Sequence, residues 1–143
     1  MKRTFTTFLA LALLATLAPA AFAADENNEE CSNATMQGNY IFSFSGWYTF
    51  GSPLDLSKAF LYNIVGISKF DGAGHFTTHN NSCFNGACFP GEGSGTYVIN
   101  PDCSTTAQIG TGTYFGTITR DGKTEYVVET DPGSNVSGTV TKQ

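Results

Sequence analysis

Turn-forming residues divide the chain after residue 38 into short segments of alternating polarity. Glycine or proline recurs about every 8 to 15 residues, and no stretch after the first 23 residues has apolar side chains at the 3.6-residue period of a helix. In residues 38–50, Tyr40, Phe42 and Phe44 share one face of an extended chain, while Ser43 and Ser45 share the other. The pattern predicts an all-β fold.

Eight strands are predicted, and short turns join them into an antiparallel meander. Their ranges are 38–50, 59–70, 75–82, 95–99, 104–110, 113–119, 124–130 and 135–141. A flat sheet of eight strands has two unprotected edges, and closure into a small β-barrel removes both. A β-sandwich is the alternative, because short loops fit it equally well. An outer-membrane barrel would need a lipid-facing apolar band on every strand. The polar strand 75–82 and the threonine-rich strands at 104–119 do not supply one.

The first 23 residues have the layout of a secretory signal peptide. Lys2 and Arg3 precede an apolar run over residues 9–18, and Ala21-Phe22-Ala23 resembles a peptidase site. A membrane anchor is the alternative. Cleavage would leave residues 24–143, a single domain with no further transmembrane span, and would place the protein in the periplasm or the medium. Residues 24–30 are predicted to be an acidic flexible tail, and 31–143 the disulfide-stapled barrel.

The charge balance excludes one class of partner. The full chain has a formal net charge of −5 at pH 7. Loss of Lys2 and Arg3 with the leader would leave 12 acidic against 5 basic residues. An acidic protein repels phosphate, so we expect no nucleic-acid partner.

All four cysteines lie in the part that would be exported, where thiols oxidise. Three pairings are possible. Cys83 and Cys88 bracket Asn85-Gly86, a dipeptide typical of tight hairpins, which favours a bond between them and leaves Cys31 to pair with Cys103. A zinc site is the alternative, but His75 and His79 would stand about 13 Å apart on a strand. We therefore expect no metal and no cofactor.

The turn residues and cysteines resemble those of a known group of proteins. The segments that carry the resemblance are Cys31 before Gly38-Asn39-Tyr40, residues 70–74, residues 95–103, and residues 130–133 with 136–138. They resemble small secreted bacterial proteins of unassigned function, which are similar at fold level to the allene oxide cyclase-like and dirigent-like β-barrels. The resemblance implies an eight-stranded barrel with an apolar cavity and a trimeric homo-oligomer. It implies no catalytic residue at a particular position.

The candidate site is an aromatic face. Seven aromatic side chains are predicted to point inward and to bind a small apolar ligand, or else to fill the barrel as its core: Tyr40, Phe42, Phe44, Tyr62, Phe70, Tyr97 and Tyr126. Glu125 and Glu129 alternate with Tyr126 and are therefore expected to face water. His75 and His79, opposite Phe76 on their strand, are expected to do the same.

No convergent set of titratable residues emerges from the sequence, so we assign no catalytic residue. The favoured hypothesis is a secreted or periplasmic barrel that binds a small apolar ligand or a partner without catalysis. The alternative is a cofactor-free cyclase or isomerase that acts in the barrel cavity. Outward Trp47, Val65 and Ile67 are candidates for a subunit interface. An adhesion or carbohydrate-binding module would instead expose Trp47 and Tyr48 together near one rim.

Overall fold

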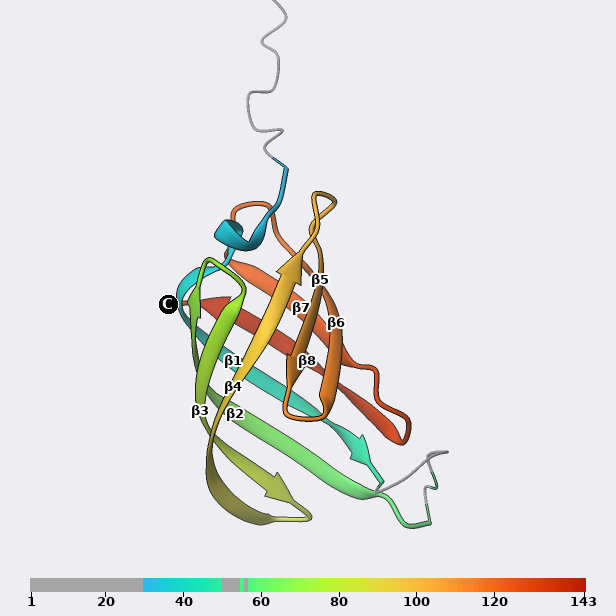
Figure 1. Ribbon diagram of the computed structural model, residues 1–143. Helices are drawn as coiled ribbons and strands as arrows, with labels where there is room; N and C mark the ends of the chain where they lie inside the picture. Colours follow the sequence, from blue (N-terminus) through green and yellow to red (C-terminus); the bar gives the residue numbers. More distant parts are fainter. Residues whose placement is uncertain (1–29, 50–54, 56) are drawn as a thin grey trace, which may run out of the picture.

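The computed structural model describes residues 30–49, 55 and 57–143 (Figure 1). Within these residues the chain forms one short 3₁₀ helix and eight antiparallel strands that close into a barrel. The elements are η1 (Asn33–Thr35), β1 (Gln37–Tyr48), β2 (Phe60–Asp71), β3 (His75–Phe84), β4 (Ala87–Ile99), β5 (Ser104–Ile109), β6 (Gly112–Ile118), β7 (Thr124–Glu129) and β8 (Ser134–Lys142). Each strand pairs with the next, and β8 pairs with β1. The predicted barrel is confirmed. The β-sandwich alternative is wrong, because the β1–β8 ladder joins what would be the two edges.

The largest boundary error concerns β4, which begins at Ala87 rather than at Gly95. Gly91 and Gly93, which lie before the predicted strand 95–99, are both inside the β3–β4 ladder. A Cβ atom on Gly93 would lie 2.9 Å from Cδ1 of Ile109, and one on Gly95 would lie 2.6 Å from the Phe76 ring. These glycines therefore leave inward space for side chains of neighbouring strands, and the strand continues through them.

Inward glycines also mark places where strand backbones approach closely. A Cβ atom would lie 2.0 Å from a carbonyl oxygen of the neighbouring strand at Gly46 and Gly138, and 2.3 Å from one at Gly66 and Gly95. A side chain at these positions would push the strands apart. Glycine at such positions is a device by which a sheet bends enough to close.

Two disulfides join the cysteines as predicted. Cys83 and Cys88 are direct cross-strand partners at the tip of the β3–β4 hairpin, where Asn85 and Gly86 both have positive φ, 47° and 89°. Such a pair of angles is typical of a type I′ turn. Cys31 and Cys103, which are 4% and 5% exposed, are joined across 72 residues of sequence.

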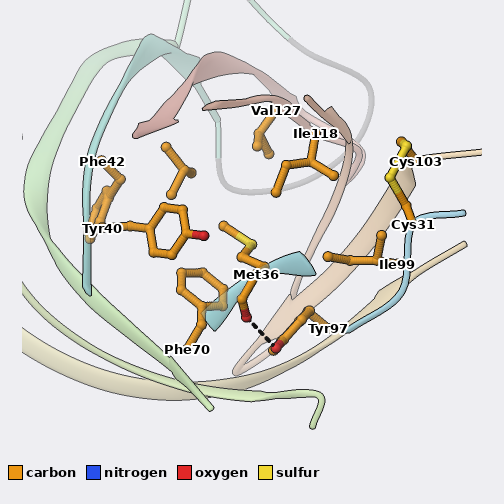
Figure 2. Packing of buried hydrophobic residues seen from close by; sticks show 11 residues of the cluster. Cys31, Met36, Tyr40, Phe42, Phe70, Tyr97, Ile99, Cys103, Ile118 and Val127 are labelled. Atoms are coloured by element: carbon orange, nitrogen blue, oxygen red, sulfur yellow. Dashed lines mark hydrogen bonds between the residues drawn. A yellow bond between two sulfur atoms is a disulfide. The ribbon is translucent and has the colours of Figure 1, made fainter. Parts of the chain in front are cut away.

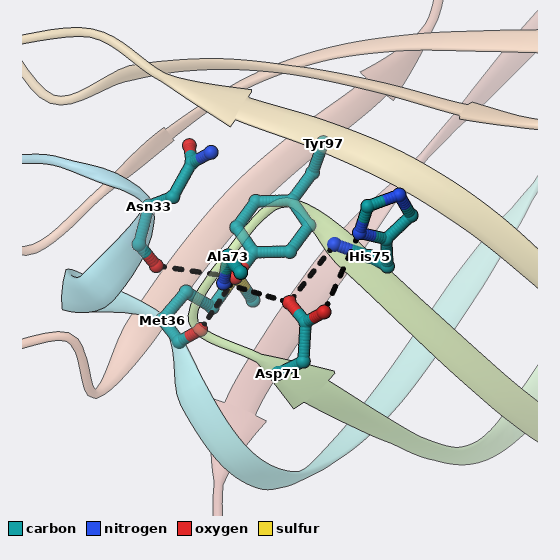
Figure 3. A network of polar contacts seen from close by, with 6 residues as sticks. All are labelled: Asn33, Met36, Asp71, Ala73, His75 and Tyr97. Atoms are coloured by element: carbon teal, nitrogen blue, oxygen red, sulfur yellow. Dashed lines mark hydrogen bonds and ion pairs between the residues drawn. The ribbon is translucent and has the colours of Figure 1, made fainter.

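The N-terminal segment covers one end of the barrel (Figures 1 and 3). The Tyr97 hydroxyl donates to the carbonyl oxygens of Met36 at 2.8 Å and Asn33 at 3.1 Å. Asn33 in turn accepts from the Ile99 N–H through its side-chain oxygen, at 2.8 Å. The Asp71 carboxylate beside this segment accepts from the N–H groups of Ala73 and His75, which fixes the β2–β3 turn. The segment containing η1 is therefore anchored by hydrogen bonds to β4 as well as by the Cys31–Cys103 bond.

In the part of the chain that the structure describes, no helix is both long and apolar enough to cross a membrane. The signal peptide predicted for residues 1–23 lies outside the described residues. So does the predicted acidic tail, apart from Glu30, which is exposed.

Candidate functional site

Side chains at alternate positions along the strands point into the barrel and form its interior (Figure 2). The fully buried Tyr40 packs edge-on against Phe70, with ring centroids 5.2 Å apart, and its hydroxyl donates to the Gly122 carbonyl at 2.7 Å. Phe70 stacks on Phe76 at 5.0 Å and meets Tyr97 edge-on at 5.2 Å. This aromatic cluster fills the interior near the end that η1 covers.

A cavity of about 110 Å³ remains inside the barrel beside this cluster. Most of its lining is apolar, and the lining includes Phe42, Phe44, Ile64, Phe70, Phe76, Tyr97, Ile109, Tyr114 and Val140. Its polar lining residues are Ser68, Thr78, Asn80, Thr105 and Glu125, beside the two tyrosines. The arrangement of apolar walls with a few placed polar groups is typical of small-molecule sites.

The seven predicted site residues have three different outcomes. Phe42, Phe44, Phe70 and Tyr97 line the cavity, as expected for inward side chains. Tyr40 also points inward but belongs to the packed core, outside the cavity lining. Tyr62 is half-buried and packs against Phe84, with ring centroids 5.0 Å apart, away from the cavity.

The prediction for Tyr126 is wrong, and the error reverses the faces of β7. Tyr126 points outward and is 58% exposed, whereas Glu125 and Val127 point inward and are 6% and 7% exposed. Both faces of residues 124–130 contain apolar side chains, so alternation alone does not decide the phase. The ladder decides it, because Glu125 is the cross-strand partner of the inward residues Ile118 and Val140.

Glu125 occupies a site prepared by a glycine on the neighbouring strand. The Thr105 hydroxyl on β5 donates to Oε1 of Glu125 on β7, so the contact passes over β6. Gly116 of β6 makes room for it, since a Cβ atom there would lie 2.7 Å from the Thr105 hydroxyl oxygen and 3.1 Å from Oε1. Burial raises the pKa of Glu125, and the Thr105 hydrogen bond lowers it by less. The protonated form of this carboxyl is therefore favoured relative to that of an exposed glutamate.

We expect Glu125→Gln to make the protein more tolerant of alkaline pH. The folded-state pKa of Glu125 is raised above the value of 4.5 taken for the unfolded chain, so the folded protein binds this proton more tightly. Stability from this group is complete below the unfolded pKa and is lost as pH rises through the folded pKa, by at most about 1.4 kcal/mol per pH unit. Urea unfolding from pH 4 to 9 should show a shallower decline for Glu125→Gln than for the wild type. Glu92→Gln, which removes an exposed carboxylate, is the control, and identical slopes for all three proteins would contradict the expectation.

Thr78 is the second polar residue that the sequence analysis missed. It is 3% exposed and lies opposite Ser68 in the β2–β3 ladder. Its hydroxyl is buried, and no hydrogen-bond partner for it exists among the described residues. The sequence does contain a pattern that predicts the inward position of Thr78. Phe76 and Thr78 are two residues apart, so a strand that points Phe76 inward also points Thr78 inward.

The opposite end of the barrel holds a second aromatic cluster. Tyr48 packs on Phe60 and Phe60 on Phe84, with ring centroids 5.5 and 5.4 Å apart. Burial raises the pKa of Tyr62 to about 12.

Glu129 lies on the inner face and is partly buried, which raises the pKa of its carboxyl. The prediction that Glu129 faces water is therefore wrong, for the same reason as for Glu125.

The histidines point outward, as predicted. The side chains of His75 and His79 are each 72% exposed. Nδ1 of His75 lies 3.4 Å from Oδ2 of Asp71, and Nδ1 of His79 lies 3.1 Å from Oε1 of Glu92. Over the described residues, no group of three His, Cys, Asp or Glu side chains is placed to hold a metal ion.

The outer surface carries apolar side chains, including the three predicted on β1 and β2. Trp47, Val65 and Ile67 point outward and are 46%, 54% and 47% exposed. Tyr48 follows Trp47 on the strand and faces the other side, so the two rings do not form one exposed platform.

Comparisons with protein-family models, with curated proteins and with solved structures gave no match to this chain.

Proposed function

We propose that the protein binds a small, mostly apolar molecule inside the barrel, and that it does so without catalysing a reaction. The observation that carries the proposal is the cavity of about 110 Å³, with apolar walls and a few buried polar groups. Its volume sets the size of the ligand. An apolar cavity of about 150 Å³ binds benzene, so this one suits a ligand, or one end of a ligand, of about four to six non-hydrogen atoms.

We also propose that the protein acts outside the cytoplasm, in the periplasm or the medium. The two disulfides support this location, because structural disulfides persist in oxidising compartments. The signal peptide expected from Lys2, Arg3 and the apolar run after them agrees with it. N-terminal sequencing of the protein from its source should then begin at Ala24, and a chain that retains Met1 would contradict export.

Binding is tested with cyclopentane, a ring of suitable size without polar groups. Cyclopentane should shift the methyl NMR signals of residues that line the cavity, such as Ile64, Ile109 and Val140, and saturate at millimolar concentration. Ala107→Leu should abolish these shifts, because Ala107 lines the cavity and the larger side chain occupies its space. Thr106→Leu adds the same side chain to the exposed outer face of the same strand and should leave binding unchanged. Absence of any saturable shift in the wild type would overturn the proposed function.

A second candidate function is a cofactor-free cyclase or isomerase. The buried carboxyl of Glu125 in the cavity lining favours it. A neutral carboxylic acid in an apolar site can donate a hydrogen bond to a carbonyl oxygen and so promote enolisation, in which a water molecule takes the α-proton. A ketone with the same five-membered ring as cyclopentane distinguishes catalysis from binding. Cyclopentanone in D₂O would gain deuterium at its α-carbons faster with the wild type than with Glu125→Gln if the site were catalytic. Equal rates would leave binding as the function.

A further inference from the structure

The cavity is accessible from the end of the barrel that lies away from η1, here called the open end. Met36 and Ile99 line the cavity nearest η1 and are 1% and 5% exposed. Asn80, Ile109 and Tyr114 line it toward the other end and are half-buried. Because these three side chains point inward, solvent reaches the surface that they expose through the open end. A ligand that enters the cavity therefore passes the residues around that end.

Glu129 lies at the open end, beside the cavity. It is the last residue of β7 and the cross-strand partner of Tyr114, so the two side chains are neighbours on the inner face. Burial raises the pKa of the Tyr48, Tyr62 and Tyr114 hydroxyls, and the Glu129 carboxylate raises each of them further. An electrostatic effect on all three hydroxyls places the carboxylate close to them. The open end therefore has an inward carboxylate among aromatic side chains.

The surroundings of Glu129 favour a cationic partner. The faces of aromatic rings carry negative potential and attract ammonium groups. Tyr114 supplies such a ring here, as do Tyr62 and Phe84, whose ring centroids lie 5.0 Å apart. Burial raises the pKa of the Glu129 carboxyl, and the Asp131 carboxylate raises it further by repulsion. A cation beside Glu129 would offset that repulsion.

Within the part of the chain that the structure describes, the protein supplies no such cation. No ion pair there includes Glu129, and no lysine, arginine or histidine lines the cavity. Lys58, on the segment between β1 and β2, is 80% exposed, and its Nζ lies 3.1 Å from Oδ2 of Asp55. Lys142 lies at the η1 end, with Nζ 5.9 Å from the centre of the Tyr40 ring. The position beside Glu129 is therefore suited to a cationic group of a ligand.

The cavity and the open end together fit a molecule with two different parts. From its volume, the apolar cavity suits a chain of about four to six carbon atoms. An ammonium group at the half-buried open end keeps part of its hydration, so it avoids the cost of full burial. A carboxylate in the same position would meet Glu129 and Asp131, two groups of like charge.

We infer that the ligand of this cavity is an aliphatic amine, with its apolar chain inside the barrel and its ammonium group paired with Glu129 at the open end. The inference rests on the proposed function and adds to it the chemical class of the ligand.

The test uses three molecules with the same chain length and different head groups: pentylammonium, pentan-1-ol and pentanoate. Their dissociation constants for the full chain are measured from the methyl NMR shifts at pH 8. An alkylamine, like the lysine side chain with its pKa of about 10.4, is protonated at this pH. We expect pentylammonium to bind about tenfold more tightly than pentan-1-ol, because it gains a charge-assisted contact with Glu129 and the attraction of the aromatic rings. Pentanoate should bind more weakly than pentan-1-ol.

Variants assign the two parts of the ligand. Glu129→Gln removes the negative charge and keeps the shape, so it should abolish the preference for pentylammonium and leave the binding of pentan-1-ol unchanged. Glu92→Gln, the matched control, removes an exposed carboxylate from the outer face and should keep the preference. Ala107→Leu fills the cavity and should abolish the binding of both molecules. Cyclopentane, titrated into each variant, reports whether the cavity is retained.

The outcomes separate this inference from the function on which it rests. If cyclopentane binds but pentan-1-ol binds as tightly as pentylammonium, or if Glu129→Gln keeps the preference, the amine is wrong and binding in the cavity stands. Equal loss of the preference in Glu92→Gln and Glu129→Gln would also overturn the inference, because net charge would then explain it. Retention of pentylammonium binding by Ala107→Leu would place the chain outside the cavity and overturn it as well. If neither cyclopentane nor pentan-1-ol binds, the proposed function itself fails.

Discussion

Replacement of both Cys31 and Cys103 by serine is expected to remove about 4 kcal/mol from the free energy of unfolding. The bond closes a loop of 72 residues, and the entropy that a disulfide removes from the unfolded chain grows with the length of the loop. Small domains are stable by about 5–15 kcal/mol, so the loss is a large fraction of the total. The measurement is the urea concentration at the midpoint of unfolding, combined with the slope of the transition.

The second disulfide provides the matched control. Cys83 and Cys88 are separated by five positions, and the same relation gives about 2 kcal/mol for their double serine variant. The long bond also anchors the segment that contains η1, so its loss should speed hydrogen exchange at the Ile118 N–H, which donates to the Cys103 carbonyl. Equal destabilisation by the two double variants would contradict the loop-length argument.

Gly138→Ala is expected to destabilise the protein by about 3 kcal/mol, near the upper end of the usual range for an overpacked core. An alanine Cβ at this position would lie 2.0 Å from the carbonyl oxygen of Ser43 and 2.6 Å from Cδ1 of Phe44. The first contact is with the backbone, so relief requires the β1 and β8 strands to move apart at the ladder that closes the barrel. Thermal unfolding monitored by circular dichroism measures the loss.

Ser137→Ala, on the exposed face of the same strand, is the control for Gly138→Ala and should change stability by less than about 0.5 kcal/mol. A Gly138→Ala protein as stable as this control would show that the close approach of β1 and β8 is not needed for closure.

Local patterns in the sequence predicted most of the fold. The turn residues at 71–74, 100–102 and 121–122 located the strand ends within a few residues, because each turn requires backbone angles that few residue types adopt. The Asn85-Gly86 turn likewise predicted the Cys83–Cys88 pair, and elimination then predicted Cys31–Cys103. The long alternation in β1 predicted which aromatic side chains point inward, since only one phase of that strand buries Tyr40, Phe42 and Phe44.

The candidate site was predicted less well, and its polar residues were missed. Glu125 was expected to face water because Tyr126 and Val128 are the more apolar pair on their strand. The structure buries a carboxyl and exposes Tyr126, which lies between Thr117 and Thr139 of the neighbouring strands. Gly116 lies inside the predicted strand 113–119, and nothing in the neighbouring sequence indicates that its missing side chain makes room for the contact between Thr105 and Glu125.

The amino-acid order of this protein is sufficient to specify eight strands, their turns and two disulfides, because each of these depends on residues close together in the chain or on the count of cysteines. The inward position of Glu125, the unsatisfied Thr78 hydroxyl and the cavity between them depend on register and on packing across the barrel. Those features arise when strands distant in sequence are joined. Pairing fixes whether each side chain of a strand faces the interior or the solvent, and a short strand takes the alternation that its neighbouring strands impose.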